Sequence, residues 1–132
     1  MSDLTLAELA SVVARRGGKL VETLARSEKA TTQDALMAVL AYVLNRFKLT
    51  HVPLESSVHR TVLGLLSEPY LTAIEISANT RLATLDLLHL AYAITLKRKG
   101  LPIKTFVTAD SGFQRAREYM ARRAGIELHL IK

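Results

Sequence analysis

The sequence predicts an α/β fold in which a short, mainly parallel sheet is flanked by many helices. Apolar residues recur at helical spacing through most of the 132 residues. Residues 105–108 form a short apolar run, and residues 126–131 alternate between apolar and polar side chains, as strands do. Few strands among so many helical segments indicate a thin sheet.

Each element has its own signal in the chain. Pro69 suits the first turn of a helix, and Gly100 and Gly125 each follow the last turn of one. Pro53 weakens the first strand, because proline cannot donate to a sheet ladder. We expect helices at residues 5–16, 19–28, 35–47, from 56 or 57 to 68, 70–78, 84–99 and 111–124, and strands at residues 51–54, 105–108 and 126–131.

Composition limits the chemistry. With 49% hydrophobic and 23% charged residues the chain is typical of globular proteins. It has no cysteine, which excludes disulfides, thiolate metal sites and a Cys nucleophile and leaves carboxylates, His and hydroxyl groups. The net charge of +6 favours a polyanionic partner such as nucleic acid.

The sequence also bears on location. Charged residues interrupt the apolar runs before any reaches the roughly 20 residues that span a bilayer. Residues 1–9 carry acids where a signal peptide would carry Lys or Arg. We expect a cytoplasmic protein with no membrane partner.

Two carboxylates occupy unusual positions. Asp86 lies in a segment that is apolar almost all the way round, which predicts a buried helix, and a buried carboxylate is costly unless a cation or donors meet it. Asp110 follows the predicted strand 105–108, and ligands bind at the carboxyl ends of strands in parallel sheets. We expect both acids to face one pocket.

Three segments together resemble the PIN-domain ribonucleases of the VapC toxin type. They are TLAEL with Glu8, LDLLHLA with Asp86, and FVTAD with Thr108 and Asp110, followed by a Gly-Ile-x-Leu strand. The resemblance implies that Glu8, Asp86 and Asp110 are catalytic and bind Mg²⁺ or Mn²⁺, with Thr108 as a supporting hydroxyl. It implies metal-dependent endonucleolytic hydrolysis of single-stranded RNA, a homodimer and an antitoxin protein as partner.

The chain departs from the family at its beginning. The family starts with an apolar strand that ends in a metal-binding Asp, and no segment here corresponds to it; Asp3 follows no strand-forming run. We therefore expect residues 1–132 to form a single PIN-like domain that is incomplete at its N-terminus. Three carboxylates instead of four would bind metal more weakly.

Each acid also has a purely structural interpretation. Thr5 and Glu8 have the spacing of a capping box. Asp86 could interact with the helix dipole from the first turn, and Asp110 could cap the helix that follows it. His89, one turn after Asp86, is interpreted as a packed core residue, since an oxygen-ligated Mg²⁺ site has little use for imidazole.

Three functions therefore stay open. The first is the metal-dependent ribonuclease. The second is a catalytically inactive PIN remnant that acts as a dimerisation or antitoxin-binding module. The third is a basic scaffold that binds RNA without cleaving it. Several basic residues at helix ends and on predicted solvated faces could hold RNA phosphates without sequence specificity: Arg15, Arg16, Lys97, Arg98, Lys99, Arg115, Arg122 and Arg123.

Overall fold

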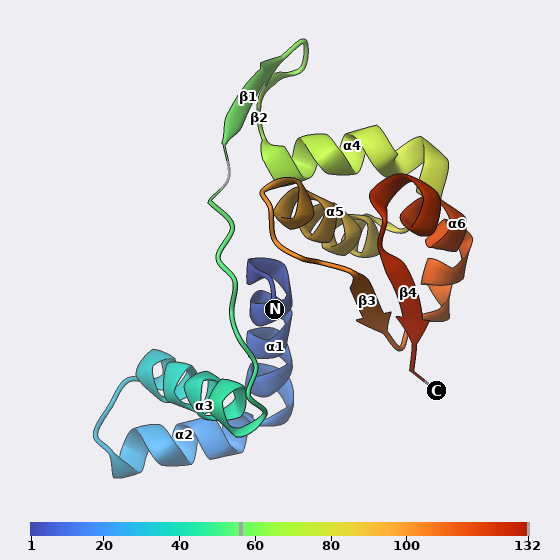
Figure 1. Cartoon of the computed structure of the whole chain (residues 1–132). Coiled ribbons are helices and arrows are strands. Elements are labelled where there is room, and N and C mark those ends of the chain that lie inside the picture. Colours follow the sequence, from blue (N-terminus) through green and yellow to red (C-terminus); the bar gives the residue numbers. More distant parts are fainter. Residues whose placement is uncertain (56, 132) are drawn as a thin grey trace. The chain divides into compact units, whose positions relative to one another are not determined.

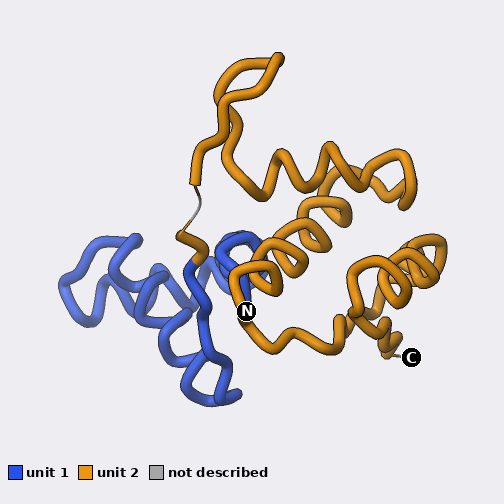
Figure 2. Tube along the Cα trace, turned by 45° about the horizontal axis from the view of Figure 1, so that its top comes forward, with its two compact units in different colours: residues 1–53 blue, residues 54–132 orange. Residues whose placement is uncertain are grey.

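The computed structural model describes residues 1–55 and 57–131, and the chain forms two compact units (Figure 2). Unit 1 is Met1–Pro53 and unit 2 is Leu54–Lys132. The described residues contain six helices, α1 to α6, and two small two-stranded sheets, one antiparallel and one parallel (Figure 1). The mixed α/β class is thus confirmed, whereas the expected central parallel sheet is represented, in these residues, by a single pair of strands.

Unit 1 contains three helices: α1 (Asp3–Arg16), α2 (Gly18–Ser27) and α3 (Thr32–Arg46). They confirm the helices predicted at residues 5–16, 19–28 and 35–47, with earlier starts. Their small core consists of Val21, Ala25 and Ala35, against which apolar residues of all three helices pack. The helical spacing predicted such packing, although α1 contributes only the partly buried Val13 to it.

The predicted strand at residues 51–54 is wrong. These residues have no strand pairing, and the segment instead returns to the first residues of the chain. The Met1 amino group donates to Thr50 O at 2.8 Å, and Val52 N donates to Met1 O at 2.8 Å. His51 Nε2 lies 2.6 Å from Asp3 Oδ1. Pro53, which lacks an N–H, is consistent with the absence of a ladder here.

Unit 2 begins with a β-hairpin where a helix was predicted. Strand β1 (Val58–Thr61) pairs antiparallel with β2 (Gly64–Ser67) through a two-residue loop. Gly64 has φ +107°, a conformation that residues with a Cβ rarely adopt. Thr61 Oγ1 supports the turn by accepting from Leu63 N and donating to Gly64 O, both at 3.0 Å. Of the two expected helix starts, Ser57 precedes β1, and residue 56 lies outside the described residues.

Helices α4 (Glu68–Thr80) and α5 (Thr84–Arg98) pack along each other and carry the main core of unit 2. Pro69 lies in the first turn of α4, as predicted, and Arg81 ends that helix in the left-handed conformation. The buried core contains Ala73, Ile76, Leu90, Ala91, Ile94, Phe113, Ala116, Met120, Ile126 and Leu128. Burial along α5 is uneven. Leu85 is exposed and Asp86 is half-buried, and the fully buried residues begin at Leu90.

The parallel pair follows. Strand β3 (Thr105–Thr108) lies where predicted, and β4 (Glu127–Leu130) lies within the predicted residues 126–131. Thr105 pairs with Glu127 and Thr108 with Leu130. The chain between them is not one regular helix: a 3-10 turn η1 (Ser111–Ala116) leads into α6 (Arg117–Tyr119) and a π-helical segment η2 (Met120–Ala124). Phe113 and Ala116 are both buried, and a spacing of three puts them on one face of a 3-10 helix.

Across the described residues, no helix is both long enough and apolar enough to cross a lipid bilayer.

Candidate functional site

Asp110 lies at the carboxyl end of β3, exposed to solvent and directly before η1. Its Oδ1 accepts a hydrogen bond from Gly112 N at 2.7 Å, so it is the N-cap of η1. Its own N–H donates to Thr108 Oγ1 at 3.0 Å. The capping interpretation is therefore confirmed, while Oδ2 makes no hydrogen bond with the described part of the chain and remains accessible to a ligand.

Two neighbours hold Asp110 in this position. The predicted supporting hydroxyl, Thr108, contacts the backbone amide of Asp110 and orients the turn through it. A Cβ on Gly112 would lie 3.0 Å from Asp110 Oδ1, which is tighter than ordinary van der Waals contact. The absence of a side chain at Gly112 thus allows the carboxylate to approach the backbone closely.

Asp86 is the acidic residue in the first turn of α5. Ala83, in an extended conformation, is the N-cap and offers no side-chain acceptor to the first turn. A carboxylate at this point stabilises the positive end of the helix dipole, typically by about 0.3–1 kcal/mol. Asp86 and His89 are both half-buried, and each has an interaction partner within the protein. The dipole interpretation of Asp86 is compatible with a ligand role, since both need an ionised carboxylate.

Glu8 lies in the second turn of α1. The capping-box interpretation is wrong, because Ser2 is the N-cap: its Oγ accepts from Thr5 N at 3.2 Å. Thr5 is already inside the helix, so Glu8 is not placed to reach back to an N-cap amide. Glu8 is half-buried and has an interaction partner in the protein.

The three carboxylates are distributed over the two units. Glu8 belongs to unit 1, whereas Asp86 and Asp110 belong to unit 2, where Leu87, Leu88, Phe106 and Phe113 pack in one core cluster. Among residues 1–55 and 57–131, no three Asp, Glu or His side chains form a group that could hold a metal ion. The three-carboxylate site stays a prediction.

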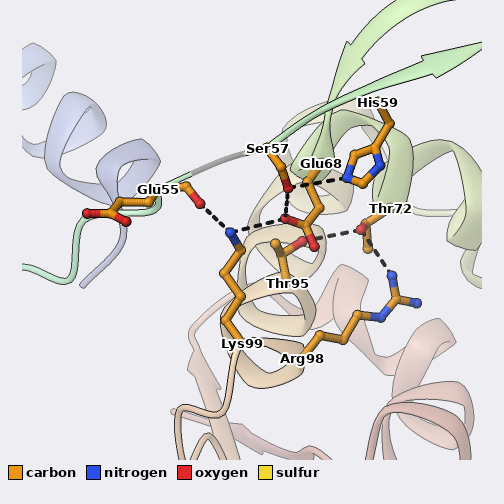
Figure 3. A network of polar contacts seen from close by, with 8 residues as sticks. All are labelled: Glu55, Ser57, His59, Glu68, Thr72, Thr95, Arg98 and Lys99. Carbon is orange, nitrogen blue, oxygen red and sulfur yellow. Dashed lines mark hydrogen bonds and ion pairs between the residues drawn. The ribbon is translucent and has the colours of Figure 1, made fainter.

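A second polar cluster, which the sequence did not predict, links the hairpin to α4 and α5 (Figure 3). Glu68 Oε2 lies 3.2 Å from Lys99 Nζ and accepts from Ser57 Oγ at 3.1 Å. Ser57 Oγ also lies 3.3 Å from His59 Nε2, and Lys99 Nζ donates to the backbone O of Glu55. Lys99 therefore connects the end of α5 to the chain on both sides of the hairpin.

The charge of Glu68 depends on this cluster. Burial raises the pKa of the Glu68 carboxyl, but the hydrogen bonds from Lys99 and Ser57 and the positive charge of Lys99 outweigh burial and hold the pKa below its ordinary value. Glu68 is thus ionised at neutral pH. The only sequence signal for it was an acid in the first turn of a helix, directly before Pro69.

Next to this cluster, α4 and α5 share a buried hydroxyl pair. Thr95 Oγ1 donates to Thr72 Oγ1 at 3.2 Å, and Arg98 Nη1 donates to Thr72 Oγ1 at 3.3 Å (Figure 3). Arg98 also pairs with Glu75 at 3.2 Å. Because buried hydroxyl groups need partners, these bonds fix how the two helices pack.

Comparisons of the chain with protein-family models, with curated proteins and with solved structures gave no match.

Proposed function

We propose that this chain is a metal-dependent endoribonuclease, similar to the PIN-domain toxins of the VapC type, that hydrolyses phosphodiester bonds in single-stranded RNA. The observation that carries the proposal is the exposed carboxylate of Asp110 at the carboxyl end of a parallel pair of strands. Ligands of parallel α/β sheets bind at this edge. Asp86, in the first turn of α5, supplies a second carboxylate in the same unit.

The proposed ligands fit a hard divalent cation. Glu8, Asp86 and Asp110 offer only oxygen donors, which Mg²⁺ and Mn²⁺ prefer. A bound ion of this kind would provide a water of lowered pKa and positive charge for the phosphodiester in the transition state. Asp110 would contribute Oδ2, while Gly112 N and Thr108 Oγ1 hold the rest of the residue in place.

The substrate class follows from charge. The chain has a net charge of +6, which favours a polyanion, and phosphate contacts give binding without sequence specificity. Single-stranded RNA is the substrate that the resemblance implies.

A cleavage assay tests this proposal. The chain is incubated with labelled single-stranded RNA and Mn²⁺ or Mg²⁺, and the same reaction with EDTA is the blank. We expect metal-dependent cleavage that falls at least about tenfold in Asp86→Asn and in Asp110→Asn. Glu118→Gln is the matched control, because it removes a carboxylate from an exposed pair with Arg122. Absence of metal-dependent cleavage, or equal rates in all three variants, refutes the proposal.

A second function, a dimerisation or antitoxin-binding module without catalysis, is supported by the β1–β2 hairpin. Its apolar residues Val58, Val62, Leu63 and Leu65 are exposed, and Val62 is fully so at 103%. Exposed apolar groups that cluster in this way are typical of interaction surfaces. The neighbouring cation Arg60 would favour an acidic segment of a partner.

Light scattering and a binding assay test this second function. A dimer that becomes monomeric in the double substitution Val62→Ser and Leu63→Ser, together with no RNA cleavage, would support it. A monomer with metal-dependent cleavage would exclude it in favour of the enzyme. Metal-independent, strongly salt-dependent RNA binding without cleavage would instead identify the RNA-binding scaffold.

A further inference from the structure

Unit 2 contains a cavity of about 180 Å³ between the end of α5 and the segment from α6 to the end of η2. Figure 1 shows the chain after α6 beside α5, and the hydrogen bond from Lys97 Nζ to Gly125 O joins the two at 2.5 Å. The lining residues are Ile94, Lys97, Arg98, Tyr119, Arg123 and Ala124. Three of these six are cations and none is an acid. Asp86 and Asp110 are not among them, so the cavity is separate from the proposed catalytic carboxylates.

The cavity keeps a surplus of positive charge. Lys97 is bonded to a backbone carbonyl, and Arg98 is partly neutralised by Glu75. Arg123 makes no hydrogen bond or ion pair with any residue that the structure describes. The two helix ends contribute only roughly half a negative charge each, which three full positive charges outweigh. An anion entering the cavity would therefore find at least one guanidinium without a partner.

The wall around Arg123 has an unusual backbone. Met120–Ala124 is π-helical, and π-helical segments are rare and frequently occur at functional sites. Tyr119 directly precedes this segment, is half-buried, and packs on the core while it lines the cavity. An aromatic ring held in this way offers a face on which a nucleic-acid base can stack.

Size limits what the cavity can bind. Pockets for drug-sized ligands have volumes of about 300–1,000 Å³, so 180 Å³ suits one phosphate with part of its nucleotide. The guanidinium fork of Arg matches phosphate oxygens in a bidentate way, which a lysine does not.

We propose that this cavity binds one phosphate of single-stranded RNA, with Arg123 paired to the phosphate oxygens and Tyr119 stacked on the adjoining base. The proposal rests on the proposed ribonuclease function and adds a substrate-binding subsite to it. The proposed subsite gives Arg123 a specific binding role that the other basic residues of the surface do not have.

Adjacent arginines provide the test. Arg122 carries the same charge next to Arg123, and both side chains are exposed, but Arg122 is in an ion pair with Glu118 and does not line the cavity. A labelled oligouridylate is titrated in EDTA, where no cleavage occurs, and binding is followed by fluorescence anisotropy. We expect Arg123→Gln to weaken binding about tenfold and to lower the slope of log K against log salt by about 0.7, whereas Arg122→Gln changes binding by less than about twofold.

Two further arms exclude simpler explanations. Tyr119→Leu removes the aromatic face but keeps an apolar side chain on the core, so binding should weaken at least about fivefold. Inorganic phosphate, titrated alone, should bind at least about tenfold more weakly than the oligouridylate, since it lacks the base. Equal losses in the two arginine variants, unchanged binding in Tyr119→Leu, or phosphate binding as tight as RNA would each overturn the subsite.

The outcomes distinguish this subsite from the enzyme. If RNA is cleaved with Mn²⁺ but Arg123→Gln and Arg122→Gln bind alike, the subsite is wrong and the ribonuclease stands. If binding depends on Arg123 and no metal restores cleavage, the subsite stands and the ribonuclease is wrong.

Discussion

Lys99 Nζ and Glu68 Oε2 lie 3.2 Å apart, and this pair joins the end of α5 to the first turn of α4 (Figure 3). Both side chains are largely shielded, with 31% of Lys99 and 21% of Glu68 exposed. The same two residues hold the chain that flanks the hairpin, through Ser57 and the backbone of Glu55. The hairpin is thus attached to its unit by a polar cluster as well as by the peptide chain.

The first prediction concerns pH. The folded pKa of Glu68 lies below its ordinary value of 4.5, so its contribution to stability is fully present above that value and is lost as pH falls through the folded pKa. Glu68→Gln should therefore lower the free energy of unfolding by about 1 kcal/mol at neutral pH. The difference in unfolding free energy between Glu68→Gln and the wild type should become smaller below about pH 4.5.

Urea unfolding of both proteins from about pH 7 to about pH 3 measures this gap. Glu118→Gln, in a far more exposed pair, should change stability by no more than a few tenths of a kcal/mol. A gap for Glu68→Gln that is constant down to the lowest pH would contradict the assignment.

The second prediction concerns the hairpin turn. Gly64 has φ +107° and open space on the side where a Cβ would lie, so Gly64→Ala should cost about 1–2 kcal/mol through backbone strain alone. Amide hydrogen exchange in β1 and β2 should become about tenfold faster. Gly18→Ala, also in open space but in a helix, should leave hairpin exchange unchanged. Unchanged amide hydrogen exchange in the hairpin of Gly64→Ala would contradict this prediction, because the turn would then accommodate alanine without strain.

The elements that bury an apolar face could be predicted from the sequence. Residues 105–108 form β3 as expected, and the helices of unit 1 lie close to their predicted ranges. Phe106 of β3 and Val13 of α1 are partly buried against the two cores, while α2 and α3 also contain fully buried residues. Gly125, with φ +62°, ends the irregular helix at the predicted residue.

The hairpin could not be predicted in this way. Val58, Val62 and Leu65 have the helical spacing on which the helix from residue 56 or 57 to 68 was predicted, yet all three lie exposed in or next to the strands of the hairpin. A helix prediction from periodicity assumes that another part of the protein packs on the apolar residues. In the described part of unit 2, no segment covers these three. The decisive signals were local: a glycine with positive φ and a threonine that bonds both ends of its turn.

The site residues differ in the same way: some could be predicted from neighbouring residues, and others depend on residues distant in sequence. The location of Asp110 after a strand, and its capping role, followed from neighbouring residues in the chain. Glu68 was missed because its environment depends on Lys99, which is distant in sequence. Arg123 and Arg122 could not be told apart for the same reason, since only the folded chain puts one of them against a cavity.

The third prediction concerns the core of unit 2. Leu90 and Leu85 lie on the same helix, but Leu90 is 0% exposed and Leu85 is 47% exposed. Leu90→Ala should lower the free energy of unfolding by about 2–5 kcal/mol, because it leaves a cavity, and Leu85→Ala by less than about 1 kcal/mol. Urea unfolding followed by circular dichroism compares the two. Equal effects would contradict the described core.

The fourth prediction separates the two roles of Asp110. Asn is as good an N-cap as Asp, so Asp110→Asn should keep the bond from Gly112 N and stay within about 0.5 kcal/mol of the wild type, while Asp110→Ala should lose about 1 kcal/mol. If the carboxylate also binds metal, both variants should lose metal-dependent RNA cleavage, because both lose the negative charge. Unfolding and cleavage are measured on the same preparations. Cleavage that survives in Asp110→Asn but not in Asp110→Ala would mean that the residue acts only by capping η1, since the amide oxygen then suffices.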